Sequence, residues 1–104
     1  MGATRQRFTP AERTSFGAVP IGGAVEWRNG AHWWPGVKTE EIGMDSIGMQ
    51  RFMLRNLADT RTIGKGQTVG GYPKHVRVPA EGTEVGSGAG KPRYRVHGGR
   101  WVVV

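Results

Sequence analysis

The chain has 104 residues, the size of a single domain, and a formal net charge of +7. The absence of cysteine excludes disulfides and thiolate metal sites, and no stretch approaches the roughly 20 apolar residues of a membrane-spanning helix. Val, Ile and Thr outnumber Leu, Met and Ala by 23 to 14, a balance that favours strands. We therefore expect a mainly β protein with a small barrel-like or meander core, one or two short helices and extended terminal segments.

Residues 1–20 are expected to form an N-terminal arm. Thr9 and Glu12 fit a capping box with Pro10 at the first helical position, which predicts one or two helical turns. The arm lacks the apolar central region of a secretory signal. The simplest expectation is a cytoplasmic protein of phage or actinobacterial origin, or a virion component if it is a phage structural protein.

A small β-barrel core is expected over residues 21–79, and its first element is a hairpin. Asn29-Gly30 is a strong hairpin signal, because a type I′ turn needs a positive φ at both central residues. This turn would place Trp27 opposite His32, and directly opposed residues share a face. The face towards the core would carry Val25, Trp27, His32 and Trp34, and the outer face Glu26, Arg28, Ala31 and Trp33.

Residues 39–48 are expected to form a loop, and the segment that follows it, residues 46–58, fits two structures. As a helix it presents one broad apolar arc, which more residues fit, and we favour this interpretation. As a strand it directs Phe52 and Leu54 inward. Both structures place Arg51 and Arg55 on one face, because a spacing of four suits either.

Short strands are predicted at Thr60–Ile63, Gln67–Val69 and His75–Val78, separated by glycines and a proline that indicate turns. Residues 80–92 are expected to form a flexible linker. Residues 93–104 predict a second hairpin, turning at Gly98-Gly99, which would dock on its own barrel because an isolated hairpin is marginal in water. One face of this hairpin would carry Tyr94, Val96, Trp101 and Val103.

Positive charge is concentrated between residues 46 and 80, which carry +5. Guanidinium groups pair well with phosphate oxygens, and glycines beside Lys65 would let backbone amides approach a phosphate. We therefore expect a non-catalytic protein that binds the phosphate backbone of a nucleic acid; alternatively, these charges only solvate the barrel. The expected phosphate-binding residues are Arg51, Arg55, Arg61, Lys65, Lys74 and Arg77. Aromatic residues expected to stack on bases or to form an interface are Trp33, Tyr72 and Trp101.

Catalytic and metal-binding motifs are not evident in the sequence. The segment 86–91 resembles a phosphate-binding loop but has Val85 and Pro92 where that motif needs Gly and Ser or Thr. The three histidines lack metal-ligand spacing, and no serine lies in a nucleophile elbow. We expect no enzyme activity, no metal and no cofactor. The alternative function is a phage-type structural or assembly protein, or a host-protein-binding adaptor, which docks on protein subunits or on its own copies through its arms and exposed tryptophans.

The sequence His32-Trp33-Trp34-Pro35-Gly36 follows a predicted strand and a glycine turn. Over residues 25–38 the chain resembles PWWP domains, which are small Tudor-like β-barrels that bind nucleosomes. The resemblance implies a five-stranded barrel in which Trp34 helps to fill the core. It does not extend to the aromatic cage for methyl-lysine, because the cage positions of the preceding turn correspond to Arg28 and Ala31.

Overall fold

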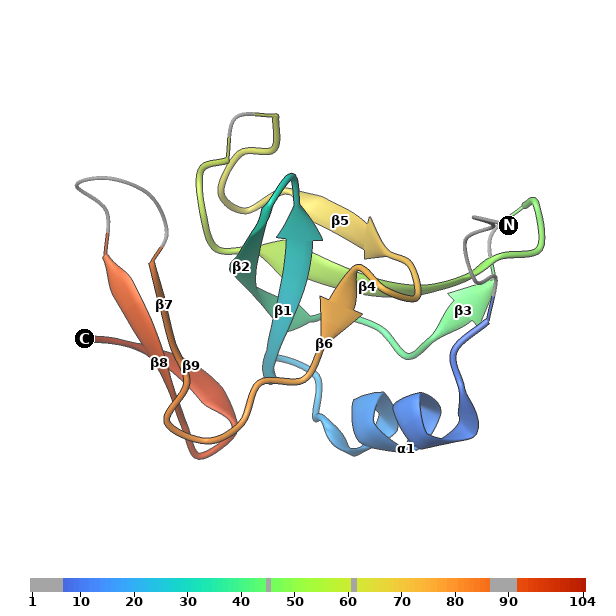
Figure 1. Ribbon diagram of the computed structural model, residues 1–104, viewed down its shortest axis with the longest axis horizontal. Helices are drawn as coiled ribbons and strands as arrows, with labels where there is room; N and C mark the ends of the chain where they lie inside the picture. The colour runs from blue at the N-terminus through green and yellow to red at the C-terminus, as the bar shows by residue number, and fades with distance from the viewer. Residues whose placement is uncertain (1–6, 45, 61, 87–91) are drawn as a thin grey trace.

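The structure is a computed structural model that describes residues 7–44, 46–60, 62–86 and 92–104. Within these ranges the chain forms one helix and nine strands, which confirms the expected mainly β fold (Figure 1). In chain order the elements are α1 (Pro10–Ala18), β1 (Ala24–Asn29), β2 (His32–Lys38), β3 (Gly43–Met44), β4 (Gln50–Asn56), β5 (Thr68–Gly71), β6 (Val76–Arg77), β7 (Glu84–Gly86), β8 (Arg93–His97) and β9 (Arg100–Val103).

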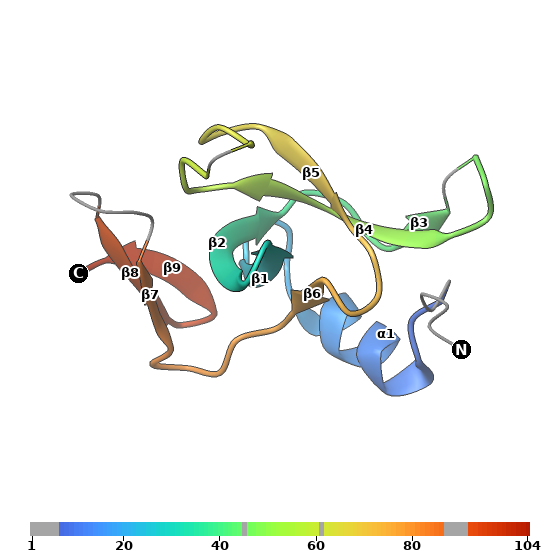
Figure 2. The same cartoon turned by 45° about the horizontal axis from the view of Figure 1, so that its top comes forward.

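Six strands form one antiparallel sheet that curls into a half barrel (Figure 2). They pair in the order β3-β4-β2-β1-β6, and β5 pairs with β4. β5 and β6 follow each other in the chain but belong to opposite ends of the sheet, and the curl brings them together along a line that we call the seam. A Cβ atom on Gly71 would lie only 1.9 Å from Cγ1 of Val76, so the two strands are closely packed there.

The β1–β2 hairpin turns one residue later than predicted. Asn29 pairs with His32 and Trp27 with Trp34, so Gly30 and Ala31 are the central turn residues. Gly30 has a φ of 66°, whereas Ala31 is not among the described residues with a positive φ. A type II′ turn, which needs a positive φ only at its first central residue, therefore replaces the predicted type I′ turn. The shift moves the pairing by two residues and leaves the same residues together on each face. The predicted burial is wrong at two positions, because His32 is exposed and Glu26 is only 2% exposed.

The helix that we favoured for residues 46–58 is wrong, and the alternative strand is correct. This segment contains β4, where the buried Phe52, Leu54 and Asn56 alternate with more exposed residues. β4 has β2 on one side and β5 on the other. These ladders and the burial of alternate residues outweigh the apolar arc that suggested a helix.

The other predicted strands are partly correct. β5 and β6 lie at or beside the segments predicted at residues 67–69 and 75–78, whereas Thr60, Thr62 and Ile63 of the first predicted segment do not belong to a strand. The Thr60 N–H donates to the Ile63 carbonyl, and the Thr60 hydroxyl accepts from the Ile63 N–H. These local bonds replace a ladder, as Thr side chains often do in turns. The short strand β3 lies in the region expected to be a loop.

The N-terminal segment contributes to the core. α1 begins with the predicted capping box, in which Thr9 and Glu12 bond each other's backbone N–H groups. Phe8, Phe16 and Val19 are buried in the same apolar cluster as the barrel residues. Part of the expected arm thus packs against the curled sheet.

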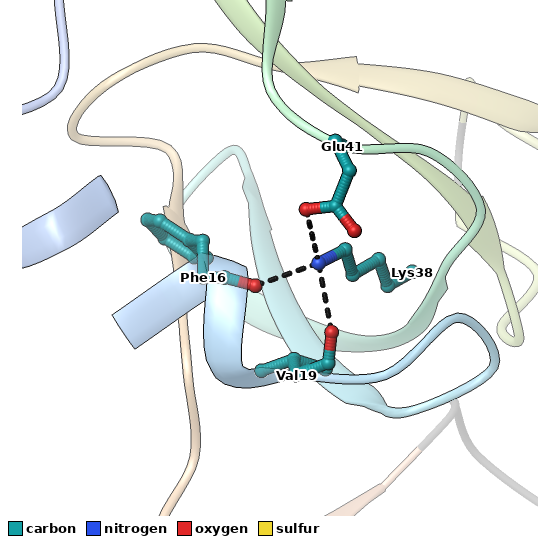
Figure 3. A network of polar contacts seen from close by, with 4 residues as sticks. All are labelled: Phe16, Val19, Lys38 and Glu41. Carbon is teal, nitrogen blue, oxygen red and sulfur yellow. Dashed lines mark hydrogen bonds and ion pairs between the residues drawn. The ribbon is translucent and has the colours of Figure 1, made fainter. Parts of the chain in front are cut away.

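Lys38 connects α1 to the barrel although its side chain is fully buried. Its ammonium group donates to the carbonyls of Phe16 at 2.8 Å and Val19 at 2.7 Å, and to Oε1 of Glu41 at 2.7 Å (Figure 3). Three donors therefore meet three acceptors, so the buried charge is compensated. Two of these acceptors are carbonyls at the C-terminal end of the helix, where a cation is also favoured by the helix dipole.

The C-terminal hairpin docks on the barrel as expected. β8 and β9 turn at Gly98-Gly99 with Val96 opposite Trp101, which confirms the predicted register. The Trp101 indole N–H donates to the carbonyls of Val25 at 3.1 Å and Gly36 at 2.9 Å.

The segment expected to be a linker contributes the strand β7, which pairs with β8. Just before β7, the Glu81 carboxylate accepts the N–H groups of Gly98 and Gly99 in the hairpin turn. These hydrogen bonds lower the pKa of the Glu81 carboxyl below its usual value. The hairpin is therefore held from this segment as well as from the barrel.

The Lys38 network yields a prediction about stability. Lys38→Met should lower the free energy of unfolding by about 2–4 kcal/mol, because it leaves two helix carbonyls without their charged donor. Glu41→Gln should cost less than about 1 kcal/mol, since the Glu41 side chain is 67% exposed. Urea denaturation of both variants measures the difference, and equal losses would contradict this role for Lys38.

Candidate nucleic-acid interface

Arg51 and Arg55 lie on the face of β4 that points away from the core, since they alternate with buried Phe52 and Leu54. Arg55 is exposed and Arg51 is half-buried. Among the described residues, no carboxylate forms an ion pair with either guanidinium group. Both cations are therefore available to a negatively charged ligand.

Arg77, which is predicted to contact phosphate, has an acidic partner within the chain. Its guanidinium donates to both carboxylate oxygens of Glu26, at 3.0 and 3.3 Å, and lies 3.9 Å from the centroid of the Trp33 ring. Only 3% of the Glu26 side chain is exposed. Arg77 thus neutralises a buried carboxylate, and one face of Trp33, expected to be a stacking surface, is covered by Arg77.

The loop between β4 and β5 does not offer the backbone amides predicted to approach a phosphate. The N–H groups of Gly64, Lys65 and Gly66 donate to the Gln67 side chain, the Asp59 carboxylate and the Asn56 carbonyl, respectively. The Lys65 side chain is exposed. Arg61, also predicted to contact phosphate, lies outside the described residues.

The buried side chain of Asn56 holds this loop through hydrogen bonds. Its side-chain oxygen accepts the Trp27 indole N–H at 3.2 Å and the Ala58 N–H at 2.9 Å. Its amide nitrogen donates to the carbonyls of Ala58 and Gly64. A fully buried side chain therefore fixes the path of the loop and, with it, the position of Lys65.

Lys74 occupies an unfavourable backbone conformation in the turn between β5 and β6. The His75 N–H donates to the Tyr72 carbonyl at 2.9 Å, with Pro73 and Lys74 between them. The φ of Lys74 is 81°, as the third residue of a type II turn requires, and glycine normally takes that position. At every other described position with a positive φ the residue is glycine. The Lys74 side chain is exposed, and the described part of the chain gives it no ion-pair partner.

A cleft of about 240 Å³ lies at the seam, next to this turn. Buried Trp27 forms part of its base, and Arg28 and His75 are exposed residues on its rim. Arg51 is not a lining residue: its Cδ lies 3.6 Å from where a Cβ atom on Gly70 would be, on the outer face of the sheet. The remaining lining residues are Asn29, Thr62, Ile63, Val69, Gly70 and Gly71.

Arg28 and His75 were not predicted from the sequence as site residues. They come together because β1 pairs with β6, and the Arg28 N–H donates to the His75 carbonyl at 2.8 Å. The one local signal was the pair Gly70-Gly71 within a strand, since strand glycines often mark a close approach of backbone or ligand.

Three other aromatic residues, Trp34, Tyr72 and Trp101, are half-buried. Trp101, predicted as a stacking or interface residue, uses its indole N–H to hold the hairpin on the barrel. Tyr72 precedes the Lys74 turn. Trp34 packs against the core cluster, and its indole N–H donates to the Asn29 carbonyl.

In the described ranges, no three His, Asp or Glu residues come together as a metal site, and no helix has the length and apolar character to cross a membrane. Comparisons with protein-family models, with curated proteins and with solved structures give no significant match for this chain.

The Lys74 turn yields a prediction about backbone strain. Lys74→Gly should raise the free energy of unfolding by about 1 kcal/mol, because glycine adopts a positive φ without a Cβ clash. Lys74→Ala removes the same charge but keeps the Cβ atom, so it should bring no such gain. Urea denaturation of both variants tests this, and equal stabilities would contradict strain at Lys74.

Proposed function

We propose that this protein binds nucleic acid without catalysis, through phosphate contacts made by Arg51, Arg55 and Lys74. The observation that carries the proposal is which basic side chains have a carboxylate partner within the described residues and which do not. Lys38, Arg77, Arg93 and Arg95 each have a carboxylate partner, whereas the described residues provide none for these three, nor for the exposed side chain of Lys65. Because an unpaired cation gives up no protein partner to meet a phosphate, these residues are favourable contacts.

The distribution of acidic residues supports the same surface. Residues 60–80, which include β5, the Lys74 turn and β6, contain no Asp or Glu. Glu26 is buried and paired, and Glu81 and Glu84 belong to the C-terminal segment. The segment from β5 to β6 therefore carries basic residues and no acidic ones, which favours a polyanion.

The proposal predicts a change in salt dependence. The double variant Arg51→Gln/Arg55→Gln should flatten the slope of log K against log salt by about 1.4–1.8, since each lost phosphate contact removes 0.7–0.9. Fluorescence polarisation with labelled single-stranded and duplex DNA at several salt concentrations measures the slope.

The matched control is Arg93→Gln/Arg95→Gln, which removes the same charge from the C-terminal sheet. Both of its arginines already contact Glu84, so this variant should leave the slope nearly unchanged. Equal effects of the two double variants would show attraction by net charge alone, and no binding at about 50 mM salt would end the proposal.

A second candidate function, self-assembly, rests on β9. This strand is at the edge of the three-stranded sheet, and Val102, Val103 and Val104 are 40%, 66% and 58% exposed. An exposed apolar edge strand is a template for pairing with another strand. We propose a second copy of the chain as the partner, because Val102 and Val103 of two such edges can pair without electrostatic repulsion.

Self-assembly predicts an oligomer that a single charge disrupts. Light scattering after size-exclusion chromatography should show a dimer or larger species, and Val103→Lys should convert it to a monomer, since a charged edge residue blocks strand pairing. Lys65→Gln, a charge change far from β9 in the chain, serves as the control. A wild-type monomer at high protein concentration would eliminate this candidate.

A further inference from the structure

The cleft at the seam has the chemistry of a site for a flat group with polar edges and anionic groups on either side of it. We propose that it receives one unstacked base of a single-stranded nucleic acid, with the flanking phosphates on Lys74 and Arg28. The inference deepens the proposed function and rests on it. It specifies a single-stranded nucleic acid as the ligand and adds a base-binding cleft, which phosphate binding alone does not require.

The inner part of the cleft is apolar. Trp27 is 4% exposed, and Ile63 and Val69 are half-buried hydrophobic residues packed against the core. All three line the cleft. A base that leaves its stack loses apolar contact, and such a surface restores it.

Backbone groups on the edge of β5 provide polar recognition. The Asn56 N–H donates to the Gln67 carbonyl, and the Thr39 N–H donates to the Met53 carbonyl on the other side of β4. By the alternation of an antiparallel ladder, Gly71 and Val69 bond to β4, so the N–H and C=O of Gly70 point away from it. Gly70 lines the cleft. One donor and one acceptor therefore lie on the edge that borders it, as the polar edge of a base requires.

Two cations, Arg28 and Lys74, lie at or beside the opening. Arg28 donates from Nε to the Gly30 carbonyl, which holds its side chain near the hairpin turn. His75 is exposed on the rim, and Lys74 precedes it in the turn. Lys74 keeps its positive φ of 81° where glycine would relieve strain, and a cation needed at this position gives that strain a function.

The cleft favours a single strand over a duplex. A base can enter it only after leaving its stack and its pair, which costs least in a single strand. Phosphate contacts on β4 are open to both forms. Comparing affinity for single-stranded and duplex DNA therefore distinguishes binding in the cleft from phosphate contacts made by Arg51 and Arg55.

The test uses three labelled DNA probes of about 12 nucleotides: an intact single strand, the same strand with abasic sites, and the duplex. The intact strand should bind the full chain on the order of tenfold more tightly than the abasic strand, and also more tightly than the duplex. Thr62→Glu, which places a negative charge in the cleft lining, should remove most of this advantage, whereas the isosteric Thr62→Gln should preserve it. Lys74→Ala and Lys74→Gly should weaken intact-strand binding equally, although their stabilities differ.

A direct readout is the Trp27 indole N–H resonance, which should shift on titration with the intact strand and not with the abasic strand. Equal affinities for intact and abasic strands, with both reduced in Arg51→Gln/Arg55→Gln, would overturn the cleft and leave phosphate binding standing. Tighter binding of the duplex would also overturn it. Absence of binding to all three probes would overturn the proposed function and the cleft together.

Discussion

The buried ammonium group of Lys38 determines how the C-terminal end of α1 meets strand β2. It extends from β2 into the interior and bonds the carbonyls of Phe16 and Val19, so α1 can end at only one place relative to the sheet. Phe16 then packs against Phe52, with ring centroids 4.8 Å apart. A polar contact thus sets the geometry, and apolar burial supplies most of the stabilisation.

Asn56 has a comparable role nearby in the β2–β4 ladder, where its buried side chain fixes the position of other segments. It lies opposite Gly36 in the β2–β4 ladder, one pair beyond Val37 and two beyond Lys38. Its contacts to Trp27 and to the loop after β4 join the base of the seam cleft to one of its walls. The surface that we propose to be functional is therefore supported by buried polar groups, which hold it in one arrangement.

Local sequence patterns predicted what local chemistry controls. The capping box around Thr9, the Gly98-Gly99 turn and the shared face of Arg51 and Arg55 depend on neighbouring residues, and the structure contains all three. The Asn29-Gly30 turn was displaced by one residue because both Asn-Gly and Gly-Ala can form two-residue turns of different type.

What the sequence could not predict depends on contacts between distant segments. The helix expected at residues 46–58 became β4 because β2 and β5 pair with it. No local feature assigns Arg77 to Glu26, or brings Arg28 beside His75, since both follow from the pairing of β1 with β6. Of the candidate site, the arginines of β4 were predictable and the cleft was not.

The indole of Trp101 has a consequence for how the protein unfolds. Its single N–H is shared by the carbonyls of Val25 and Gly36, which face each other across the β1–β2 ladder. Detaching the C-terminal sheet would deprive two strands of the barrel of this donor at once, and fraying of those strands would release the sheet. The two sheets are therefore coupled through this donor, and we expect the chain to unfold as one cooperative unit despite having two separate ladders.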